Sequence, residues 1–306
     1  MKRLFIDYNP YFVRAALAED GELVEFGVEH VTARSHVGNI YRGKVENVLG
    51  GMKAAFVNIG LERNGFLYTG DGAEGERKLS PGDEVMCQVV KEQLGAKGAR
   101  LTTDVTLPGY TLVLLPTGGF RGVSRKIEND AGRARLEKLV SSVCPQEMGF
   151  IVRSAAVKAT DEQILREFDN LMAMWKRICD DYVKASPASV GFREAQLLER
   201  VIRDNYSEEV DKIVVNEAFL AERLSARMQK VEVEYYSGQR NIFRHFGLSA
   251  QIDKLADRKV VMGGGAYLVI DRTEALTVID VNTGKFVGSK NLEDTVFRTN
   301  LAAASE

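Results

Sequence analysis

The N-terminal part of the chain alternates short apolar runs with polar turns, a pattern typical of β-strands. Three such runs open the sequence, at residues 4–6, 12–15 and 23–28. Glu19-Asp20-Gly21 predicts a hairpin turn between the second and third runs. From residue 40 to 103, glycines separate further short strands, and no long helical period interrupts them. Short strands at this close spacing predict a small closed barrel.

The middle of the chain changes to a helical period. Apolar side chains recur there at spacings of 3 and 4 residues, as one stripe expected in the core, namely Ile164, Phe168, Leu171, Trp175, Ile178 and Tyr182. Thr160 and Gln163 predict a capping box at the start of this helix. Two further helices are expected at 193–206 and 216–229, with a strand at 213–215 between them. That strand would extend the N-terminal sheet, which is too small to bury a face alone.

The C-terminal part alternates strands and turns again. Strands are expected at 266–270 and at 275–279, the second ending on Asp280, with turns at the glycines 263–265 and at 271–273. A helix is expected to begin near Asn291 and to run to Glu306. With the preceding elements, this pattern predicts an α+β protein of several domains.

Composition and charge narrow the class of protein. Apolar residues make up 45% and charged residues 27% of the 306 positions, which excludes disordered, collagen-like and disulfide-scaffold proteins. Basic and acidic residues number 41 and 43, so any nucleic-acid site has to be a local patch. No apolar run reaches the roughly 18 residues of a membrane span, and the N-terminus is charged too soon for a signal peptide. We therefore expect a cytoplasmic protein without a membrane partner, with Cys87, Cys144 and Cys179 as buried apolar side chains.

The strand before Gly284 delivers two polar side chains that could bind a metal ion. Asp280 and Asn282 point to the same side of the extended chain, because side chains alternate along a strand. Mg²⁺ prefers oxygen ligands of this kind and takes one or two protein carboxylates. The alternative is that both side chains form Asx-turns at a strand end. The residues alone leave both interpretations open.

Aromatic and basic residues occur together in the predicted barrel segment. The candidates there are Phe56, Phe66 and Lys97. Small barrels bind single-stranded nucleic acid by stacking bases on exposed aromatic rings beside a basic groove. The alternative is that each phenylalanine belongs to the barrel core.

Several ordered motifs resemble one protein family. They are GNIYRGKV at 38–45, AAFVNIGLERNGF at 54–66, GFIVRS at 149–154 and EALTVIDVNTGKFVG at 274–288. In this order they are similar to motifs of the bacterial ribonuclease E/G family, and the last motif is closer to its ribonuclease G branch. The resemblance covers essentially the whole chain.

The resemblance implies four subdomains. An RNase H-like α/β sheet would combine residues 1–34 and 199–255, with an S1 barrel of the OB-fold type at 35–103 and a sensor of the RNA 5′ end at 104–198. Residues 256–306 would form the N-terminal part of a DNase I-like catalytic subdomain. Asp7, in the RNase H-like part, is a lone carboxylate, whereas RNase H chemistry needs several around paired metals.

The resemblance also implies two places that hold RNA. The residues that would contact single-stranded RNA on the barrel are Phe56, Phe66 and Lys97. The residues that would bind a 5′-monophosphate on the sensor are Gly109, Val113, Arg153 and Ser154. The family commonly has threonine at the last of these positions, and serine keeps the hydroxyl donor.

The activity that the resemblance implies is Mg²⁺-dependent cleavage of single-stranded RNA by an endoribonuclease that favours 5′-monophosphorylated substrates. Asp280 would ligate the Mg²⁺ and Asn282 would orient it. The implied processes are maturation and decay of ribosomal and messenger RNA, and the full-length proteins of the family imply a homodimer or a higher oligomer.

One departure from the family pattern bears on activity. The family's second metal-binding aspartate and its zinc-binding C-P-x-C link do not occur in the 26 residues that follow Asp280. We therefore expect the sequence to be the N-terminal portion of such an enzyme, ending inside the catalytic subdomain, with weak or no cleavage by itself. The alternative is a catalytically incomplete RNA-binding module.

Overall fold

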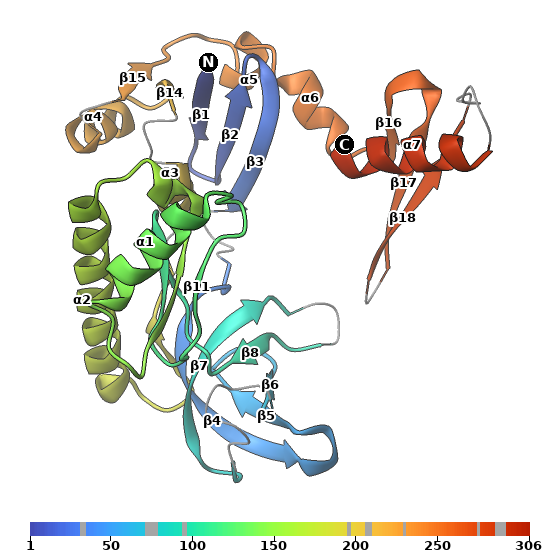
Figure 1. Ribbon diagram of the computed structural model, residues 1–306. Coiled ribbons are helices and arrows are strands. Elements are labelled where there is room, and N and C mark those ends of the chain that lie inside the picture. Colours follow the sequence, from blue (N-terminus) through green and yellow to red (C-terminus); the bar gives the residue numbers. More distant parts are fainter. Residues whose placement is uncertain are drawn as a thin grey trace.

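The computed structural model describes residues 1–30, 35–70, 79–93, 97–194, 197–205, 210–228, 231–273, 276–284 and 292–306. Helices and several separate sheets form it, which confirms the predicted α+β class. Figure 1 shows a central sheet, a barrel and a helix-covered sheet close together, with the C-terminal strands standing apart beyond helix α6.

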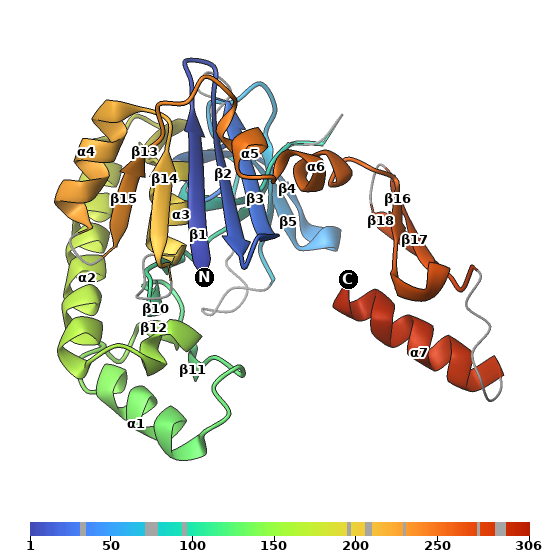
Figure 2. The ribbon, with the colours of Figure 1, turned by 90° about the horizontal axis from the view of Figure 1, so that it is seen from above.

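The central sheet has five strands in the order β15-β14-β1-β2-β3 (Figure 2). Their bounds are Lys2–Tyr8 (β1), Phe12–Glu19 (β2), Glu22–His30 (β3), Lys212–Val215 (β14) and Glu232–Tyr235 (β15). β2 and β3 meet at the predicted hairpin turn, where Asp20 and Gly21 have φ angles of 51° and 92°. β14 pairs in parallel with β1, so the chain near residue 213 extends the N-terminal sheet as predicted.

Helices cover both faces of this sheet. α3 (Leu197–Asn205) and α4 (Ala218–Arg227) pack on the face that carries Leu4 and Ile6. α5 (Ile242–His245) and α6 (Ser249–Lys254) lie on the other face, against Phe5. Because successive strand residues point to opposite faces, β1 is apolar on both, as a central strand should be. α3 and α4 confirm the two predicted helices, but both predicted starts are too early, because residues 193–194 and 216–217 are not helical. The predicted ends at 206 and 229 lie outside the described residues.

Five short strands close into a barrel, as the spacing of the glycines predicts. They are β4 (Ile40–Leu49), β5 (Ala54–Asn58), β6 (Gly65–Tyr68), β7 (Glu84–Lys91) and β8 (Arg100–Thr102). The sheet order is β4-β5-β6-β8-β7, and pairing of β4 with β7 closes it. Side chains such as Val45, Val57 and Leu101 point inward and are buried. A closed barrel of five strands is consistent with an OB fold.

A four-stranded sheet with two helices links the barrel to the central sheet. Its strands, in the order β11-β12-β10-β9, are Arg121–Val123 (β11), Gly149–Val152 (β12), Leu112–Leu115 (β10) and Leu107–Pro108 (β9). α1 (Asp130–Ser141) and α2 (Asp161–Lys184) pack on this sheet, and β13 (Ser189–Phe192) then joins the barrel beside β4. The capping box of α2 is confirmed, since Thr160 N donates to Gln163 Oε1 at 2.8 Å and Gln163 N to Thr160 Oγ1 at 3.3 Å.

The apolar stripe of α2 is confirmed for most of its length. The stripe residues that are fully buried are Ile164, Phe168, Leu171 and Ile178. Trp175 and Tyr182 are only half-buried. The Arg42 guanidinium of β4 lies over the Tyr182 ring, 5.6 Å from its centre, so the end of the stripe contacts the barrel.

The C-terminal unit is a three-stranded antiparallel sheet with one helix. β16 (Lys259–Val261), β17 (Tyr267–Arg272) and β18 (Thr277–Asn282) are followed by α7 (Leu292–Ser305). The glycines at 263–265 form the predicted turn, and the predicted helix start near Asn291 lies outside the described residues. The core of this unit is small, whereas Ile279 and Phe297 are 56% and 62% exposed.

Two predicted strand ends in this unit are wrong. β17 continues to Arg272 instead of turning at residue 271, because its pairing with β18 extends to Asp271 opposite Val278 and Arg272 opposite Thr277. Arg258 Nε and Nη2 donate to Asp271 Oδ1 and Oδ2 at 2.5 and 2.8 Å. This ion pair also holds the pKa of Asp271 below its ordinary value. β18 likewise continues beyond residue 279 to Asn282, where it pairs with Tyr267.

Two further expectations concern the burial of the cysteines and the absence of a membrane-spanning segment. Cys87 and Cys144 are buried as predicted, while Cys179 is only half-buried. Within the described ranges, no helix is both long enough and apolar enough to span a bilayer.

Candidate functional site

The barrel presents a row of aromatic and basic side chains on its outer surface. Phe56 and Phe66 are direct cross-strand partners on β5 and β6, and both are half-buried. Their ring centres lie 5.8 Å apart with the planes at 73°, an edge-to-face contact. The neighbouring residues Ala55, Val57 and Leu67 point into the barrel instead. Strand alternation therefore puts both phenylalanines on the outside, at the edge of the core.

Basic side chains flank this row. The chain at 97–100 runs beside β6, where Phe66 N donates to the Ala99 carbonyl at 2.7 Å and Phe66 is paired with Arg100. Lys97 is exposed on the same stretch, and Gly98 passes so close to Asn64 that a Cβ there would lie 1.9 Å from its carbonyl oxygen. The structure thus brings Phe56 and Phe66 into contact and places Lys97 on the stretch of chain that runs beside the strand of Phe66.

Tyr68 extends the aromatic row and was missed by the sequence reasoning. It lies two positions after Phe66 on β6, so it shares the outer face. The rings of the two residues are 5.6 Å apart at 73°, and Tyr68 is 43% exposed. The signal that could have found it is the period of two along the strand.

The four predicted 5′-end residues gather at one end of the sheet that carries α1 and α2. Arg153 and Ser154 directly follow β12, while Val113 lies on β10 and is paired with Ile151 of β12. Arg153 Nη1 donates to the Gly109 carbonyl at 2.7 Å, and Arg153 N donates to the Thr111 carbonyl at 2.8 Å. Ser154 is exposed at the start of a short 3₁₀ turn. Arginine and hydroxyl donors of this kind suit a phosphate group.

Glu167 of α2 also contacts this loop, although no pattern in the sequence marks it. It accepts hydrogen bonds from Tyr110 N at 2.5 Å and Thr111 N at 2.7 Å, and also from the Thr111 hydroxyl. Tyr110 and Glu167 are 57 positions apart in the chain. A surface helix carries many glutamates, so only the folded structure singles this one out.

Asp280 and Asn282 lie together on an open sheet face. Asn282 Nδ2 donates to Asp280 Oδ2 at 2.8 Å. Their cross-strand partners are Val269 and Tyr267, so these four side chains share one face. Leu268, between those partners, points the opposite way and packs against Ala303 of α7. Helix α7 therefore covers the other face, and Asp280 is exposed.

This pair fits a Mg²⁺ ion in the type of atom it offers. A carboxylate and an amide both supply hard oxygen ligands, and Mg²⁺ commonly keeps water and substrate phosphate in its other positions. Asp271 shares the face of Asp280, but both of its oxygens are taken by Arg258. Within the part of the chain that is described, no three His, Cys, Asp or Glu side chains gather as a metal site.

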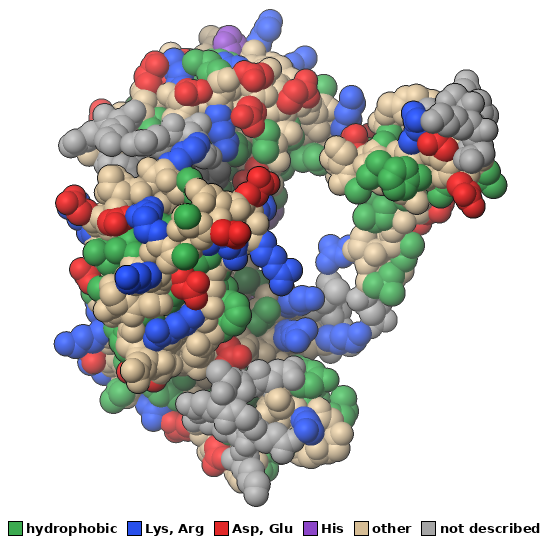
Figure 3. Space-filling view, viewed as in Figure 1, with side chains coloured by type: hydrophobic (Ala, Val, Ile, Leu, Met, Phe, Trp, Pro, Cys, Tyr) green, Lys and Arg blue, Asp and Glu red, His purple; other side chains and the backbone are tan. Residues whose placement is uncertain are grey.

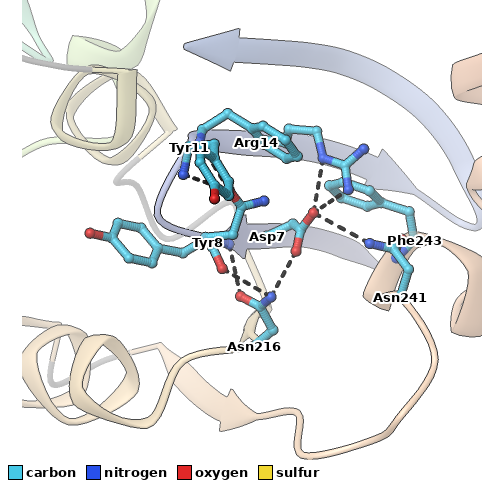
Figure 4. A network of polar contacts seen from close by, with 9 residues as sticks. Asp7, Tyr8, Tyr11, Arg14, Asn216, Asn241 and Phe243 are labelled. Atoms are coloured by element: carbon cyan, nitrogen blue, oxygen red, sulfur yellow. Dashed lines mark hydrogen bonds and ion pairs between the residues drawn. The ribbon is translucent and has the colours of Figure 1, made fainter. Parts of the chain in front are cut away.

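A buried polar network surrounds Asp7 in the central sheet (Figure 4). Arg14 Nε donates to Asp7 Oδ2 at 2.9 Å, and Arg14 Nη2 contacts the same oxygen. Asn216 Nδ2 donates to Asp7 Oδ1 at 2.7 Å, and Asn241 Nδ2 to Oδ2 at 3.3 Å. These partners are an arginine and two amides, so the network ties β1 to β2 and to the starts of α4 and α5.

The three candidate groups lie on separate units. The aromatic row is on the barrel, Arg153 on the neighbouring sheet and Asp280 on the C-terminal unit (Figure 1). Figure 3 shows Lys and Arg side chains gathered where the barrel side of the molecule faces this C-terminal unit. A ligand that touched all three groups would have to be long and would meet positive charge on the way.

Comparisons with known proteins show the family to which the chain is related. The model of the Ribonuclease E/G family matches residues 106–306. Ribonuclease G of Salmonella typhimurium is 38% identical to the chain, as is ribonuclease G of Haemophilus influenzae, and each match covers 98% of this chain. Ribonuclease E of a Nostoc species is 35% identical over 100% of it. The chain spans 66% of the length of either ribonuclease G and 47% of that ribonuclease E. By these matches, the chain belongs to the ribonuclease E/G family.

Proposed function

We propose that the protein acts as an endoribonuclease that cleaves single-stranded RNA with Mg²⁺ and favours substrates with a 5′-monophosphate. The observation that carries the proposal is the Asp280–Asn282 pair on an open sheet face, in a member of the ribonuclease E/G family. The names of its relatives, ribonuclease G and ribonuclease E, support action on RNA.

The proposal also assigns a subdomain type to each structural unit of the molecule. We assign the central sheet as RNase H-like, the barrel as S1, the sheet that carries Arg153 as the 5′-end sensor and the C-terminal unit as part of a DNase I-like subdomain. Processing and decay of ribosomal and messenger RNA in the cytoplasm, by a homodimer or higher oligomer, belong to the same proposal.

Single-stranded RNA would lie on the outer face of the barrel. Phe56 and Phe66 offer ring surfaces on which bases stack, and Tyr68 continues this surface. Lys97 and Arg100, on the stretch of chain that leads into the strand beside Phe66, would neutralise backbone phosphates. Stacking tolerates any base, so this face would bind RNA without a strict sequence requirement.

The 5′ end of the RNA would be bound near Arg153. A guanidinium presents planar donors that match the oxygens of a phosphate, and the adjacent Ser154 hydroxyl adds another donor. The bond from Arg153 to the Gly109 carbonyl orients the guanidinium before RNA arrives. A 5′-hydroxyl lacks the charge that this group would recognise, so RNA with a 5′-monophosphate should bind more tightly.

Cleavage would take place at the open face of β18. When bound, Mg²⁺ offsets charge that develops on the phosphate oxygens and makes water a stronger acid. Asp280 would hold it through a carboxylate oxygen, and Asn282 orients that carboxylate through its amide hydrogen bond of 2.8 Å.

A second candidate function is RNA binding without cleavage. The observation that favours it is the engagement of Asp271, the other carboxylate on the Asp280 face, in its ion pair with Arg258. Asp280 then has no second carboxylate to share a metal among the described residues of that face. One carboxylate makes a weak site, so slow or no cleavage by the 306-residue chain would follow.

The test measures Mg²⁺-dependent cleavage of 5′-monophosphorylated single-stranded RNA by the purified chain and by its Asp280→Asn variant, with RNA binding measured in parallel. The endoribonuclease proposal expects slow cleavage that the variant loses while it still binds RNA. Equal cleavage by both proteins would contradict the role of Asp280. Tight binding with no cleavage by either protein would favour the second candidate.

A further inference from the structure

The peptide group between Gly109 and Tyr110 lies between two opposite charges. Its carbonyl accepts a hydrogen bond from Arg153 Nη1 at 2.7 Å, and its N–H donates to Glu167 Oε1 at 2.5 Å. In a trans peptide these two atoms point in opposite directions, and the described part of the chain contains no cis peptide bond. The guanidinium and the carboxylate therefore hold the same peptide from its two sides.

Glu167 holds the rest of the loop as well. Its other oxygen accepts from Thr111 N at 2.7 Å and from the Thr111 hydroxyl, and Thr111 is buried. The fit is close, because a Cβ at Gly109 would lie 2.7 Å from Glu167 Oε1. The neighbouring side chain on α2, Phe168, is in the core, so the carboxylate is fixed on a rigid helix.

Such an arrangement strengthens both hydrogen bonds. A bond to a charged partner is about twice as strong as a neutral one, and bonds in a chain polarise one another. The negative carboxylate makes the Gly109 carbonyl a better acceptor, which fixes the Arg153 guanidinium more firmly. Because Glu167 is itself negative, it would repel a phosphate, so it acts through Arg153 and the loop.

We propose that Glu167 is a positioning residue for the RNA 5′ end, which holds residues 109–111 so that Arg153 is directed at a 5′-monophosphate. This inference rests on the proposed function, since it assumes that Arg153 binds that phosphate. It predicts that Glu167 sets the preference for 5′-monophosphorylated RNA, not the general affinity for RNA.

The experiment compares binding of one fluorescent single-stranded RNA, made with a 5′-monophosphate or a 5′-hydroxyl, to the 306-residue chain and to Glu167→Gln. The glutamine keeps the shape of the side chain but loses its charge and one acceptor. The ratio of the two affinities should fall about three- to tenfold in the variant. Affinity for the 5′-hydroxyl RNA should stay the same.

Two matched control variants test whether a change in the affinity ratio could come from the loss of a negative charge on α2, or from lower stability of the sheet, instead of from the position of Glu167. Asp169→Asn makes the same change of charge at an exposed position on the same helix. Arg121→Gln removes an arginine at the other end of the same sheet from Arg153. Arg121 Nη2 there donates a hydrogen bond to the Pro145 carbonyl at 2.6 Å. Neither control should change the affinity ratio, although the second should lower the melting temperature.

The outcomes distinguish this inference from the proposed function. If the unmodified chain prefers the 5′-monophosphate and Glu167→Gln keeps that preference, the inference is wrong and the proposed function stands. If the unmodified chain shows no preference, 5′-end sensing is wrong and the inference falls with it. Should Glu167→Gln fail to fold, Thr111→Val removes only the hydroxyl bond to Glu167 and should lower the ratio by a smaller factor. An unchanged ratio in that variant would likewise overturn the inference.

Discussion

Asp7 is a buried carboxylate whose oxygens are bonded by residues from distant parts of the sequence. Arg14 lies on the next strand, whereas Asn216 and Asn241 are 209 and 234 positions away. The side chain of Asp7 is 6% exposed and that of Arg14 is 29% exposed. In such a network, removal of one partner leaves buried polar groups unpaired, so Asp7 should matter for stability.

Replacement of Asp7 should therefore destabilise the central sheet. Asp7→Ala removes the carboxylate that accepts from the Arg14 guanidinium and from the amides of Asn216 and Asn241, and we expect a loss of about 2–4 kcal/mol in the free energy of unfolding. Urea denaturation measures this loss. The matched control is Asp20→Ala, which removes an exposed ion pair with the N-terminus and should change little. A loss no larger for Asp7→Ala than for Asp20→Ala would contradict the prediction.

The cysteines should differ in reactivity. Burial raises the pKa of the Cys87 thiol to about 12, whereas Cys179 is half-buried and its pKa is raised by burial and by Asp180. The reactive thiolate forms only as the pH rises through the pKa, so Cys87 stays a thiol at pH 8. Iodoacetamide should then label Cys179 before Cys87 in the folded protein and both in urea, as peptide mass spectrometry would report. Rapid labelling of Cys87 in the folded chain would count against its burial.

The candidate site residues differ in how far their positions and neighbours could be predicted from the sequence. Asp280 and Asn282 are two positions apart on one strand, so their shared side follows from strand geometry alone. The position of Phe66 beside Phe56 could not be predicted from one strand alone, because their edge-to-face contact depends on how β5 and β6 pair in the barrel. Glu167 depends on a helix and a loop that meet only in the folded chain, and no local pattern marks it.

At the scale of elements, the outer face of β5 and β6 is the surface on which RNA binding should depend. Phe66→Ala removes the middle ring of the aromatic row. We expect this change to weaken binding of single-stranded RNA by about 1–3 kcal/mol. Phe120→Ala is the control, because Phe120 is 64% exposed but lies outside the barrel, directly before β11 of the neighbouring sheet. Equal losses in the two variants, measured by fluorescence anisotropy, would argue against base stacking on the barrel.

Helix α2 should depend on its capping box for part of its stability. Thr160→Ala removes the side-chain oxygen that accepts from Gln163 N, and loss of such a cap costs about 1 kcal/mol. Thermal unfolding of the variant measures the change. A melting temperature identical to that of the unmodified chain would show that packing of the buried stripe alone fixes the start of α2.

Elements with a strong local signal were predicted well, and their ends were not. The period of α2 and its cap are local, so both were confirmed. The turn expected at residue 271 was wrong because β17 stays paired with β18 as far as Arg272, which lies opposite Thr277. Trp175 and Tyr182 fit the helical stripe but are only half-buried, although Ile178 between them is fully buried. The helical period alone therefore does not fix how deeply each side chain of the stripe is buried.

At the scale of the whole molecule, the order of the motifs predicted the family, and the sequence did not place the units relative to one another. The barrel, the sheet with Arg153 and the C-terminal unit carry separate groups, which a long RNA could join (Figure 1). Their relative placement depends on contacts such as the bonds from Arg42 Nη1 to the Val183 and Ala185 carbonyls, at 3.1 and 2.8 Å. Such contacts join parts of the chain that no local pattern connects.

The most direct test of the account is whether the chain recognises the 5′ end of RNA through Arg153. The measurement is the affinity of the unmodified chain and of Arg153→Gln for the same single-stranded RNA with a 5′-monophosphate or a 5′-hydroxyl. We expect tighter binding of the 5′-monophosphorylated RNA by the unmodified chain. The variant should bind both RNAs equally, because it loses the guanidinium that is fixed on the Gly109 carbonyl. A preference that survives in Arg153→Gln, or that the unmodified chain does not show, would contradict the account.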